Sequence, residues 1–418
     1  MKPKIATHLF LAALAFACAR VDTAEGPATE TAPAPVQHSM DRASMWKTTL
    51  DKTPVAATAA FDQKGRLWRV SVVDAGYVAV SHSDDKSRSF SKAVRVNRAF
   101  EQVAAEGENR PKIAVATNGT IYVAYTQSLE QPFAGRIRFS RSVDGGTRFS
   151  APMTVNTDRE ITSHRFDALG VNARGQVYVA WLDKRDLLTA KRKGEKYSGV
   201  ALYYVISNDA GTSFTPNVKL LDHLCECCRI GMAMDVDDTP VIAWRHVFEN
   251  SVRDHALVRL DGKAKPSRFS HENWQIEACP HHGPAVSIAG DGIYHLVWFS
   301  GATHHPGLFY TRSDDQGKSF RVPIGFGNEE AQPSHPHVLS MGRQVFVTWK
   351  EFDGEYSIIR LMRSNDGNGS WSVPQTLAST KGASDHPALI NDARNAFLSW
   401  HTIDEGYRLI ELDEVTQL

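Results

Sequence analysis

A short apolar and aromatic run that ends in Trp or Tyr recurs along most of the chain. Each copy follows a glycine or polar turn, and the copies lie at 119–125, 175–181, 239–244, 292–298, 343–349 and 394–400, with a weaker one at 65–71. Their length and their β-branched and aromatic content are typical of strands rather than helices. Because the copies recur about every 51 to 63 residues, the pattern predicts a repeat architecture built from one supersecondary unit.

A polar turn motif, Ser-x-Asp-x-Gly-x-Ser/Thr-Phe/Trp, falls between these runs. Copies lie at 83–90, 142–149, 207–214, 313–320 and 364–371, and a degenerate copy near 259–269 keeps only Asp261 and Gly262. We expect the Asp to cap the amides of a turn, the Gly to supply a positive φ, and the aromatic side chain to pack beneath the sheet. The motif therefore predicts a hairpin turn in each repeat.

These segments resemble the Asp-box, or BNR, repeats of sialidases and related β-propellers, and the resemblance covers about residues 46–418. It implies an all-β fold of radial four-stranded blades. Each unit would run from strand A through the apolar strand B and strand C to the Asp-box turn and strand D. Such folds place the Asp-box turns on the face opposite the segments that lead into strand A.

The number of blades depends on how the last unit is completed. Six units have all four strands, whereas the seventh, which begins at 384–390, has no strand D of its own. The segment "MWKTTL" at 45–50 resembles the strand-D segments. We therefore predict a single domain over 46–418 with seven blades, the last closed by the N-terminal segment, and keep six blades, the number in the sialidases, as the alternative.

The residues before this domain have the features of an export signal and a tether. Lys2 and Lys4 precede the apolar run 9–17, which is too short to span a bilayer and predicts a signal peptide over 1–18. Cys18 follows a sequence that resembles a bacterial lipobox, so lipidation of Cys18 and ordinary cleavage nearby remain alternatives. Residues 19–45 are rich in Ala, Thr, Pro and Glu and predict a flexible tether. We expect a periplasmic protein or an outer-membrane lipoprotein.

The charge balance narrows the range of partners. Lys plus Arg and Asp plus Glu each number 47, which gives a formal net charge of zero. A nucleic-acid-binding protein should carry a basic excess, so we expect no nucleic-acid partner. No stretch after residue 20 approaches the roughly 18 apolar residues of a membrane helix. We therefore expect membrane contact only through a lipid on Cys18.

Propeller geometry gathers polar residues at one end of the central channel. The segments that lead into successive A strands should converge there. They carry Arg110, His164, Arg165, Cys227, Cys228, Arg229, His281, His282, His335, His337, Asp385 and His386. With the loops between strands B and C, this face holds up to twelve of the 17 histidines. The sequence thus predicts a site rich in His, Cys and Arg at the mouth of the channel.

The stretch "HLCECCRI" places Cys225, Cys227 and Cys228 before the fourth inner strand, and Cys279 precedes the fifth. In an exported chain these four cysteines can form one or two disulfides. Thiolates together with imidazoles can instead hold Cu(I) or Zn(II). The candidate ligands are His164, Cys227, Cys228, Cys279, His281, His282, His335 and His386. Both interpretations predict that Cys279 contacts the 225–228 segment.

The resemblance to sialidases also implies a possible glycan site. Sialidases hold a substrate carboxylate with three arginines and use a Tyr–Glu pair and an Asp in catalysis. Arg110, Arg165 and Arg229 could form such a cluster and, with Asp385, are the candidates for binding an anionic or glycan ligand. However, "NRPKI" departs from the family pattern, and no Tyr occupies a matching position, so no catalytic residue is assigned. Metal or anion binding is favoured, and an exo-sialidase or related glycoside hydrolase and a non-catalytic interaction module remain alternatives.

Overall fold

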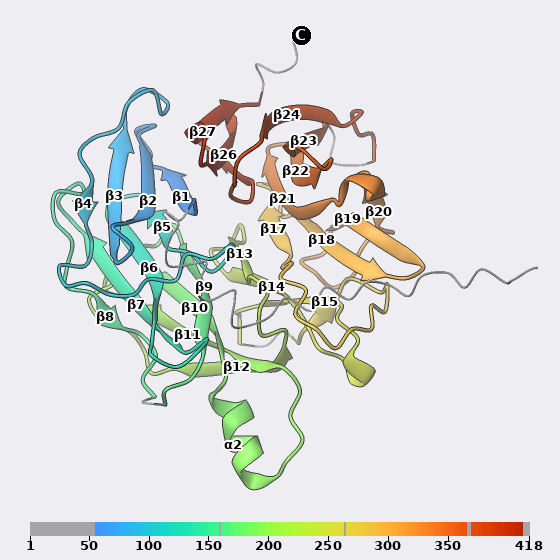
Figure 1. The fold of residues 1–418 in the computed structure, drawn as a ribbon, viewed down its shortest axis with the longest axis horizontal. Coiled ribbons are helices and arrows are strands. Elements are labelled where there is room, and N and C mark those ends of the chain that lie inside the picture. Colours follow the sequence, from blue (N-terminus) through green and yellow to red (C-terminus); the bar gives the residue numbers. More distant parts are fainter. Residues whose placement is uncertain (1–54, 159, 263–264, 366–368, 413–418) are drawn as a thin grey trace, which may run out of the picture. The chain divides into compact units, whose positions relative to one another are not determined.

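The chain forms a ring of antiparallel sheets, seen in a computed structural model that describes residues 55–412 apart from 159, 263–264 and 366–368 (Figure 1). Seven sheets are present, and in each of them strands that follow one another along the chain are hydrogen-bonded neighbours. The first strands of successive sheets contact one another around the ring, and the first strand of the seventh sheet returns to that of the first. The prediction of a seven-bladed β-propeller is therefore confirmed.

The first four blades follow the predicted order of strands A to D. Blade 1 contains β1 (Ala57–Phe61), β2 (Leu67–Val73), β3 (Tyr77–Ser83) and β4 (Val94–Arg95). Blade 2 contains β5 (Lys112–Val115), β6 (Ile121–Ser128), β7 (Gly135–Ser142) and β8 (Met153–Thr154). Blade 3 contains β9 (His164–Val171), β10 (Val177–Asp183), β11 (Val200–Ser207) and β12 (Val218–Leu224). Blade 4 contains β13 (Gly231–Met234), β14 (Pro240–Arg245), β15 (His255–Arg259) and β16 (Ser267–Arg268), with a 3-10 turn at Glu249–Ser251.

The remaining blades continue the same pattern. Blade 5 contains β17 (Ala285–Ile288), β18 (Tyr294–Ala302), β19 (His305–Ser313) and β20 (Ile324–Phe326), followed by a 3-10 turn at Glu329–Ala331. Blade 6 contains β21 (Ser334–Met341), β22 (Gln344–Phe352), β23 (Ser357–Ser364) and β24 (Gln375–Thr380). Blade 7 has three strands among the described residues, β25 (Ala388–Asn391), β26 (Ala396–Thr402) and β27 (Gly406–Glu411). The proposed closing segment 45–50, the signal 1–18, the tether 19–45 and Cys18 lie outside the described residues.

The apolar runs of the sequence are the second strands of the blades, and they form the core. Five of these strands carry a Trp that is at most 1% exposed. These residues are Trp181, Trp244, Trp298, Trp349 and Trp400. A second strand lies inside its own sheet and between two neighbouring blades, which is why its side chains are buried on both faces and read as one continuous apolar run. The core is thus a series of layers between adjacent blades.

The Asp-box turns have the geometry that the motif predicts. In blade 3 Asp209 accepts hydrogen bonds from the backbone N–H of Ser213 at 2.9 Å and from its hydroxyl at 2.6 Å. These bonds, together with one from the hydroxyl of Ser207, hold the pKa of Asp209 below its ordinary value. In blade 1 Ser87 replaces the usual glycine and keeps the left-handed conformation, with a φ of 70°. Because strand direction alternates within each blade, these turns lie opposite the segments that lead into the first strands.

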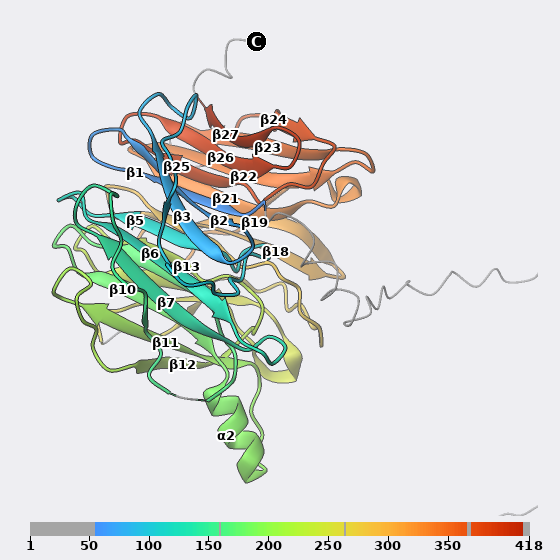
Figure 2. The ribbon, with the colours of Figure 1, turned by 60° about the vertical axis from the view of Figure 1, so that its left-hand side comes forward.

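One loop contains a helix that the sequence pattern had not predicted. The connection between β10 and β11 contains α2 (Arg185–Lys193), which projects away from the sheets (Figures 1 and 2). Gly194 ends the helix with a φ of 71°, and its N–H bonds back to the carbonyls of Ala190 and Lys191. Within the described part of the chain, no helix combines the length and the apolar character needed to cross a membrane.

Candidate functional site

The segments that lead into the inner strands meet at one end of the channel, as predicted. Arg229, which precedes β13, connects three of them. Its guanidinium donates to Glu108 Oε1 at 2.6 Å, to the carbonyl of Pro284 at 3.0 Å and to the carbonyl of Pro336 at 2.6 Å. The segments before β5, β13 and β17 and the beginning of β21 are therefore in direct contact. Residues far apart in sequence share one site because the ring closes.

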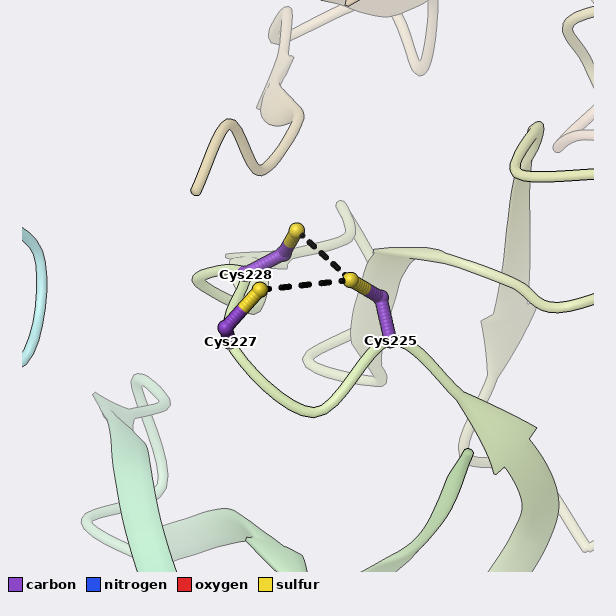
Figure 3. A group of neighbouring side chains, drawn as sticks. All are labelled: Cys225, Cys227 and Cys228. Carbon is purple, nitrogen blue, oxygen red and sulfur yellow. Dashed lines mark hydrogen bonds between the residues drawn. The ribbon is translucent and has the colours of Figure 1, made fainter. Parts of the chain in front are cut away.

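Three cysteines converge in the loop between β12 and β13 (Figure 3). The Sγ atom of Cys225 lies 3.6 Å from that of Cys227 and 3.0 Å from that of Cys228. All three sulfurs lie within 4.8 Å of one another, and all three residues are buried. The four cysteines of the described chain are free thiols, so the disulfides considered from the sequence are not present in this structure.

Cys279 lies beside this cluster but differs from its members because it is exposed. Its thiol lies within interaction range of the Cys227 thiol, and its Sγ donates to Glu226 Oε1 at 3.9 Å. Glu226 in turn forms an ion pair with Lys184, the residue before α2. The predicted contact between Cys279 and the 225–228 segment is confirmed.

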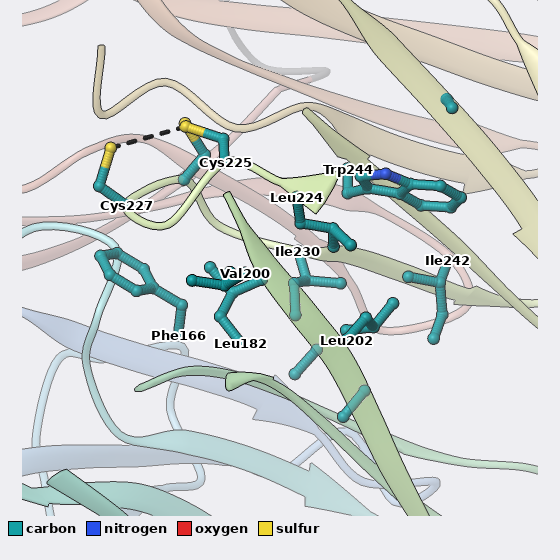
Figure 4. Packing of buried hydrophobic residues seen from close by; sticks show 14 of the residues in the cluster. Phe166, Leu182, Val200, Leu202, Leu224, Cys225, Cys227, Ile230, Ile242 and Trp244 are labelled. Atoms are coloured by element: carbon teal, nitrogen blue, oxygen red, sulfur yellow. Dashed lines mark hydrogen bonds between the residues drawn. The ribbon is translucent and has the colours of Figure 1, made fainter. Parts of the chain in front are cut away.

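The cysteine cluster lies between an apolar wall and two arginines. Phe166, Leu224 and Ile230 belong to the same buried cluster as the three cysteines (Figure 4). Arg253 Nη1 donates to Cys225 Sγ at 3.4 Å. Hydrogen bonds from Cys227 and Cys228 and the positive charge of Arg245 hold the pKa of the Cys225 thiol well below its ordinary value. The surroundings therefore favour a thiolate at Cys225.

Three of the predicted histidines form a stack next to Glu108. The ring centroid of His335 lies 4.4 Å from that of His282 and 3.4 Å from that of His386. His335 Nδ1 lies 3.3 Å from Glu108 Oε1, whereas the Nδ1 atoms of His282 and His386 are buried without a hydrogen-bond partner. Burial lowers the pKa of His282 and of His386 well below the ordinary value, so both rings are neutral at pH 7.

His281 and His337 flank this stack. His281 is exposed, with a φ of 57°, and its ring lies within electrostatic range of Cys225 and Glu108. The Nδ1 atom of His337 accepts the backbone N–H of Leu389 at 3.3 Å. Burial lowers the pKa of His337 to about 3. His337 is therefore a neutral hydrogen-bond acceptor between blades 6 and 7.

His164 belongs to a separate cluster in blade 3. Its Nε2 atom lies 2.7 Å from Asp158 Oδ2 and 3.6 Å from Asp183 Oδ2, and its Nδ1 atom lies 2.8 Å from the carbonyl of Gly135. Arg185 Nη2 contacts the same two carboxylates, at 2.8 and 2.6 Å. Burial opposes protonation, but the two carboxylates prevail and raise the pKa of His164. The guanidinium of Arg185 already supplies the cation that these carboxylates would otherwise bind.

The structure thus divides the predicted metal ligands into groups. Among the described residues, only two sets of at least three His, Cys, Asp or Glu have ligand atoms within 4.8 Å of one another. They are the three cysteines Cys225, Cys227 and Cys228, and the set Asp158, His164 and Asp183. The stacked histidines His282, His335 and His386 join neither set. The eight candidate ligands therefore do not surround a single point.

Each of the three predicted arginines is already paired with a carboxylate. Arg229 pairs with Glu108, and Arg165 pairs with Glu106. Arg110 forms a buried ion pair with Asp385, whose carboxylate also accepts the backbone N–H of Ala57 at 3.1 Å. A substrate carboxylate would have to displace these acids, so the arginines do not form a free anion-binding set.

Three charged residues of the channel were missed in the sequence. Glu108 lies in the segment "ENRPKI", where its position next to the inner strand was the only available signal. Lys112 donates to the carbonyls of Glu108 at 3.0 Å and Arg110 at 2.8 Å, and burial lowers the pKa of Lys112 to about 8. Burial raises the pKa of Asp167 on the neighbouring strand β9. Lys112 and Asp167 thus lie on inner strands, and Glu108 precedes one of them.

Comparisons with known proteins establish the fold. No protein-family model matches the chain, and no curated protein matches it in sequence. A solved structure of a Dyadobacter fermentans protein of unknown function is 14% identical, with a TM-score of 0.50, and the match covers 76% of this chain and 95% of that one. A Hadza microbial sialidase is 12% identical, with a TM-score of 0.50 and coverage of 80% and 74%. An ulvan lyase bound to a saccharide is 11% identical, with a TM-score of 0.53 and coverage of 86% and 93%. The chain therefore has a sialidase-like β-propeller fold.

Proposed function

We propose that the protein binds one Cu(I) ion at the channel mouth through Cys225, Cys227 and Cys228. The observation that carries this proposal is the convergence of three buried sulfurs whose cysteines are free in this structure. Thiolates favour soft ions such as Cu(I) and Zn(II). Structural zinc sites have four protein ligands, and catalytic zinc sites have three together with an open position for water. Three buried thiols converge here, so the geometry favours Cu(I).

The distances between the sulfurs are compatible with this coordination. With metal–sulfur bonds near 2.3 Å, three sulfurs in a plane around one ion lie about 4 Å apart. The contacts of Cys225 with Cys228 and Cys227, at 3.0 and 3.6 Å, need to lengthen by no more than about 1 Å to reach that value. Rotation of the cysteine side chains can supply such a change without moving β12 or β13.

The surroundings support a thiolate-bound cation. Arg253 donates a hydrogen bond to Cys225 Sγ and would offset the negative charge of three thiolates around a monovalent ion. Leu224 and Ile230 exclude water from one side of the cluster. A dry, positively flanked cluster of thiolates is well suited to retain a soft monovalent cation.

An anaerobic competition titration tests this proposal. Reduced protein should remove copper from the coloured Cu(I)–bicinchoninate complex with a stoichiometry of one, and Cys228→Ser should weaken the affinity by more than about 100-fold, since even the loss of a residue that only supports a ligand costs 10- to 100-fold. His305→Gln, which alters an exposed histidine, is the matched control and should bind normally. Tight copper binding by Cys228→Ser, or none by the unaltered protein, would contradict the proposal. If the unaltered protein bound Zn(II) more tightly than Cu(I), the ion at this site would be Zn(II).

A glycoside hydrolase such as an exo-sialidase is the second candidate. It is favoured by the pairing of a buried carboxylate, Glu108, with Arg229 and His335 at the mouth of a propeller channel. In this interpretation an anionic glycan would exchange with Glu108 for Arg229. Turnover of a fluorogenic sialoside that is lost in Arg229→Ala would support this candidate. The absence of turnover by the unaltered protein would contradict sialidase activity.

A further inference from the structure

Access to the cysteine cluster is unequal. Cys225, Cys227 and Cys228 are 1%, 6% and 2% exposed, whereas Cys279 is exposed. The cluster lies on the segment before β13, and Cys279 lies on the segment before β17 in the next blade. Cys279 Sγ contacts Glu226, the residue between Cys225 and Cys227, at 3.9 Å. Its thiol also lies within interaction range of Cys227, which is the least buried of the three. The four sulfurs therefore form a path from solvent to the buried cluster.

We propose that Cys279 is the receiving thiol, which accepts Cu(I) from an external thiolate carrier and passes it to Cys227. This inference rests on the proposed copper site. The carrier can be a small thiol or a protein that presents Cu(I) on cysteines, because a buried site is filled most directly by exchange between sulfur ligands at its surface. Copper stays in the monovalent state throughout, so the transfer needs neither an oxidant nor a reductant.

The exchange balances in ligands and protons. Cys279 loses its proton and its sulfur binds Cu(I) while one thiolate of the carrier leaves. Glu226 Oε1, 3.9 Å from Cys279 Sγ, is placed to accept that proton, and Lys184 holds the Glu226 side chain through its ion pair. Cys227 then binds the ion and the second carrier thiolate leaves. Cys225 and Cys228 complete the coordination, and the protons of Cys227 and Cys228 pass to the two carrier thiolates that have left. Cys279 takes its proton back from Glu226 as it is released.

A receiving thiol should affect the rate of loading far more than the final affinity. Without Cys279 the carrier must wait for the buried cluster to open, and a required conformational change lowers association rates. Cys279 is not one of the three ligands in the buried set. Its loss should therefore leave the equilibrium almost unchanged. An equilibrium ligand would behave in the opposite way, since its loss would weaken affinity directly.

The test measures transfer from Cu(I)–glutathione to the reduced protein by anaerobic stopped flow, together with the equilibrium affinity. For Cys279→Ser we expect transfer to slow by at least about tenfold, because the buried set must open first, and the affinity to change by less than about tenfold. Glu277→Gln, an exposed change in the same segment, is the control and should transfer at the unaltered rate. Because Cys279 is exposed, its substitution should not impair folding.

The outcomes separate this inference from the copper site itself. An unchanged transfer rate in Cys279→Ser, with normal binding by the unaltered protein, would overturn the receiving role and leave the site intact. A loss of affinity of about 100-fold or more, the cost expected for a ligand, would also overturn it, because Cys279 would then be a permanent ligand. If the unaltered protein bound no Cu(I), both proposals would fail.

Discussion

The ion pair between Glu108 and Arg229 should be a major source of stability at the channel mouth. The two side chains are 4% and 14% exposed, and Arg229 Nη1 lies 2.6 Å from Glu108 Oε1. The pair connects the segments before β5 and β13, which are 121 positions apart in the sequence. The variant Glu108→Gln removes the negative charge and keeps the shape and an acceptor oxygen, so it isolates the electrostatic contribution.

The expected size of the effect follows from burial and distance. Two unit charges about 4 Å apart attract each other by about 4 kcal/mol at an effective dielectric constant near 20. Removing one partner of a buried pair typically costs about 3–5 kcal/mol, since the other charge stays buried without compensation. Because Gln still accepts a hydrogen bond, we expect Glu108→Gln to lower the free energy of unfolding by about 3 kcal/mol at pH 7.

The pH dependence of this variant has a defined sign. Burial alone would raise the pKa of Glu108, but Arg229 and His335 hold it well below the ordinary value of 4.5. A carboxylate whose pKa is depressed by folding stabilises the protein above its unfolded pKa and loses that contribution as the pH falls through its folded pKa. The stability gap between the unaltered protein and Glu108→Gln should therefore be full at neutral pH and shrink below about pH 4.5.

A urea-unfolding cycle measures the coupling. It compares the unaltered protein, Glu108→Gln, Arg229→Gln and the double variant. The double variant buries neither charge, so it should be more stable than the sum of the single changes predicts, by about 2–3 kcal/mol. The exposed pair Arg192–Glu160, with side chains 58% and 41% exposed, is the control, and Arg192→Gln should leave the midpoint unchanged. Additive effects, or a loss below about 1 kcal/mol in Glu108→Gln, would refute this reasoning.

Three further measurements test the core and the buried titrating groups. Trp349 is fully buried and donates to Glu351 at 2.7 Å, so Trp349→Ala should cost about 3–5 kcal/mol in urea unfolding, and a loss near zero would contradict its place in the core. Lys112 should titrate near pH 8 rather than 10.5 when followed by NMR of isotopically methylated lysines, because burial lowers its pKa to about 8. Burial lowers the pKa of His295 to about 4 and that of His337 to about 3, from 6.5. Since the unfolded chain binds these protons first, unfolding free energy should fall as the pH drops below 6.5, and His295→Gln should flatten that slope.

The fold was predictable because its determinants are local and repeated. The runs ending in residues such as Trp181 and Trp349 became the second strands of blades, and the Asp-box turns formed the hydrogen bonds expected of Asp209. Seven similar units restrict the possible architectures strongly, since each unit cannot bury its apolar face alone. The helix α2 was not predicted because it is a short insertion outside the repeat, where the periodic pattern carries no information.

The meeting of these segments at the candidate site was predictable from the sequence, whereas the pairing of the charged side chains there was not. Sequence order within a propeller predicts that the segments carrying Arg229 and Cys279 meet, and Arg229 donates to the carbonyl of Pro284, which follows Cys279. The pairing of each arginine with a carboxylate depends on contacts between blades. Glu108 belongs to no sequence motif that indicates its ion pair with Arg229. The separation of the histidine stack from the cysteines likewise depends on side-chain directions at His335 and its neighbours, which no spacing rule encodes.

Copper K-edge X-ray absorption on protein reduced and loaded with Cu(I) under anaerobic conditions tests the proposed site most directly. After desalting, we predict one copper per chain, bound by three sulfurs at about 2.3 Å, and loss of that signal in Cys228→Ser. Copper that does not survive desalting, or that is bound only by nitrogen and oxygen, would contradict a thiolate site built from Cys225, Cys227 and Cys228.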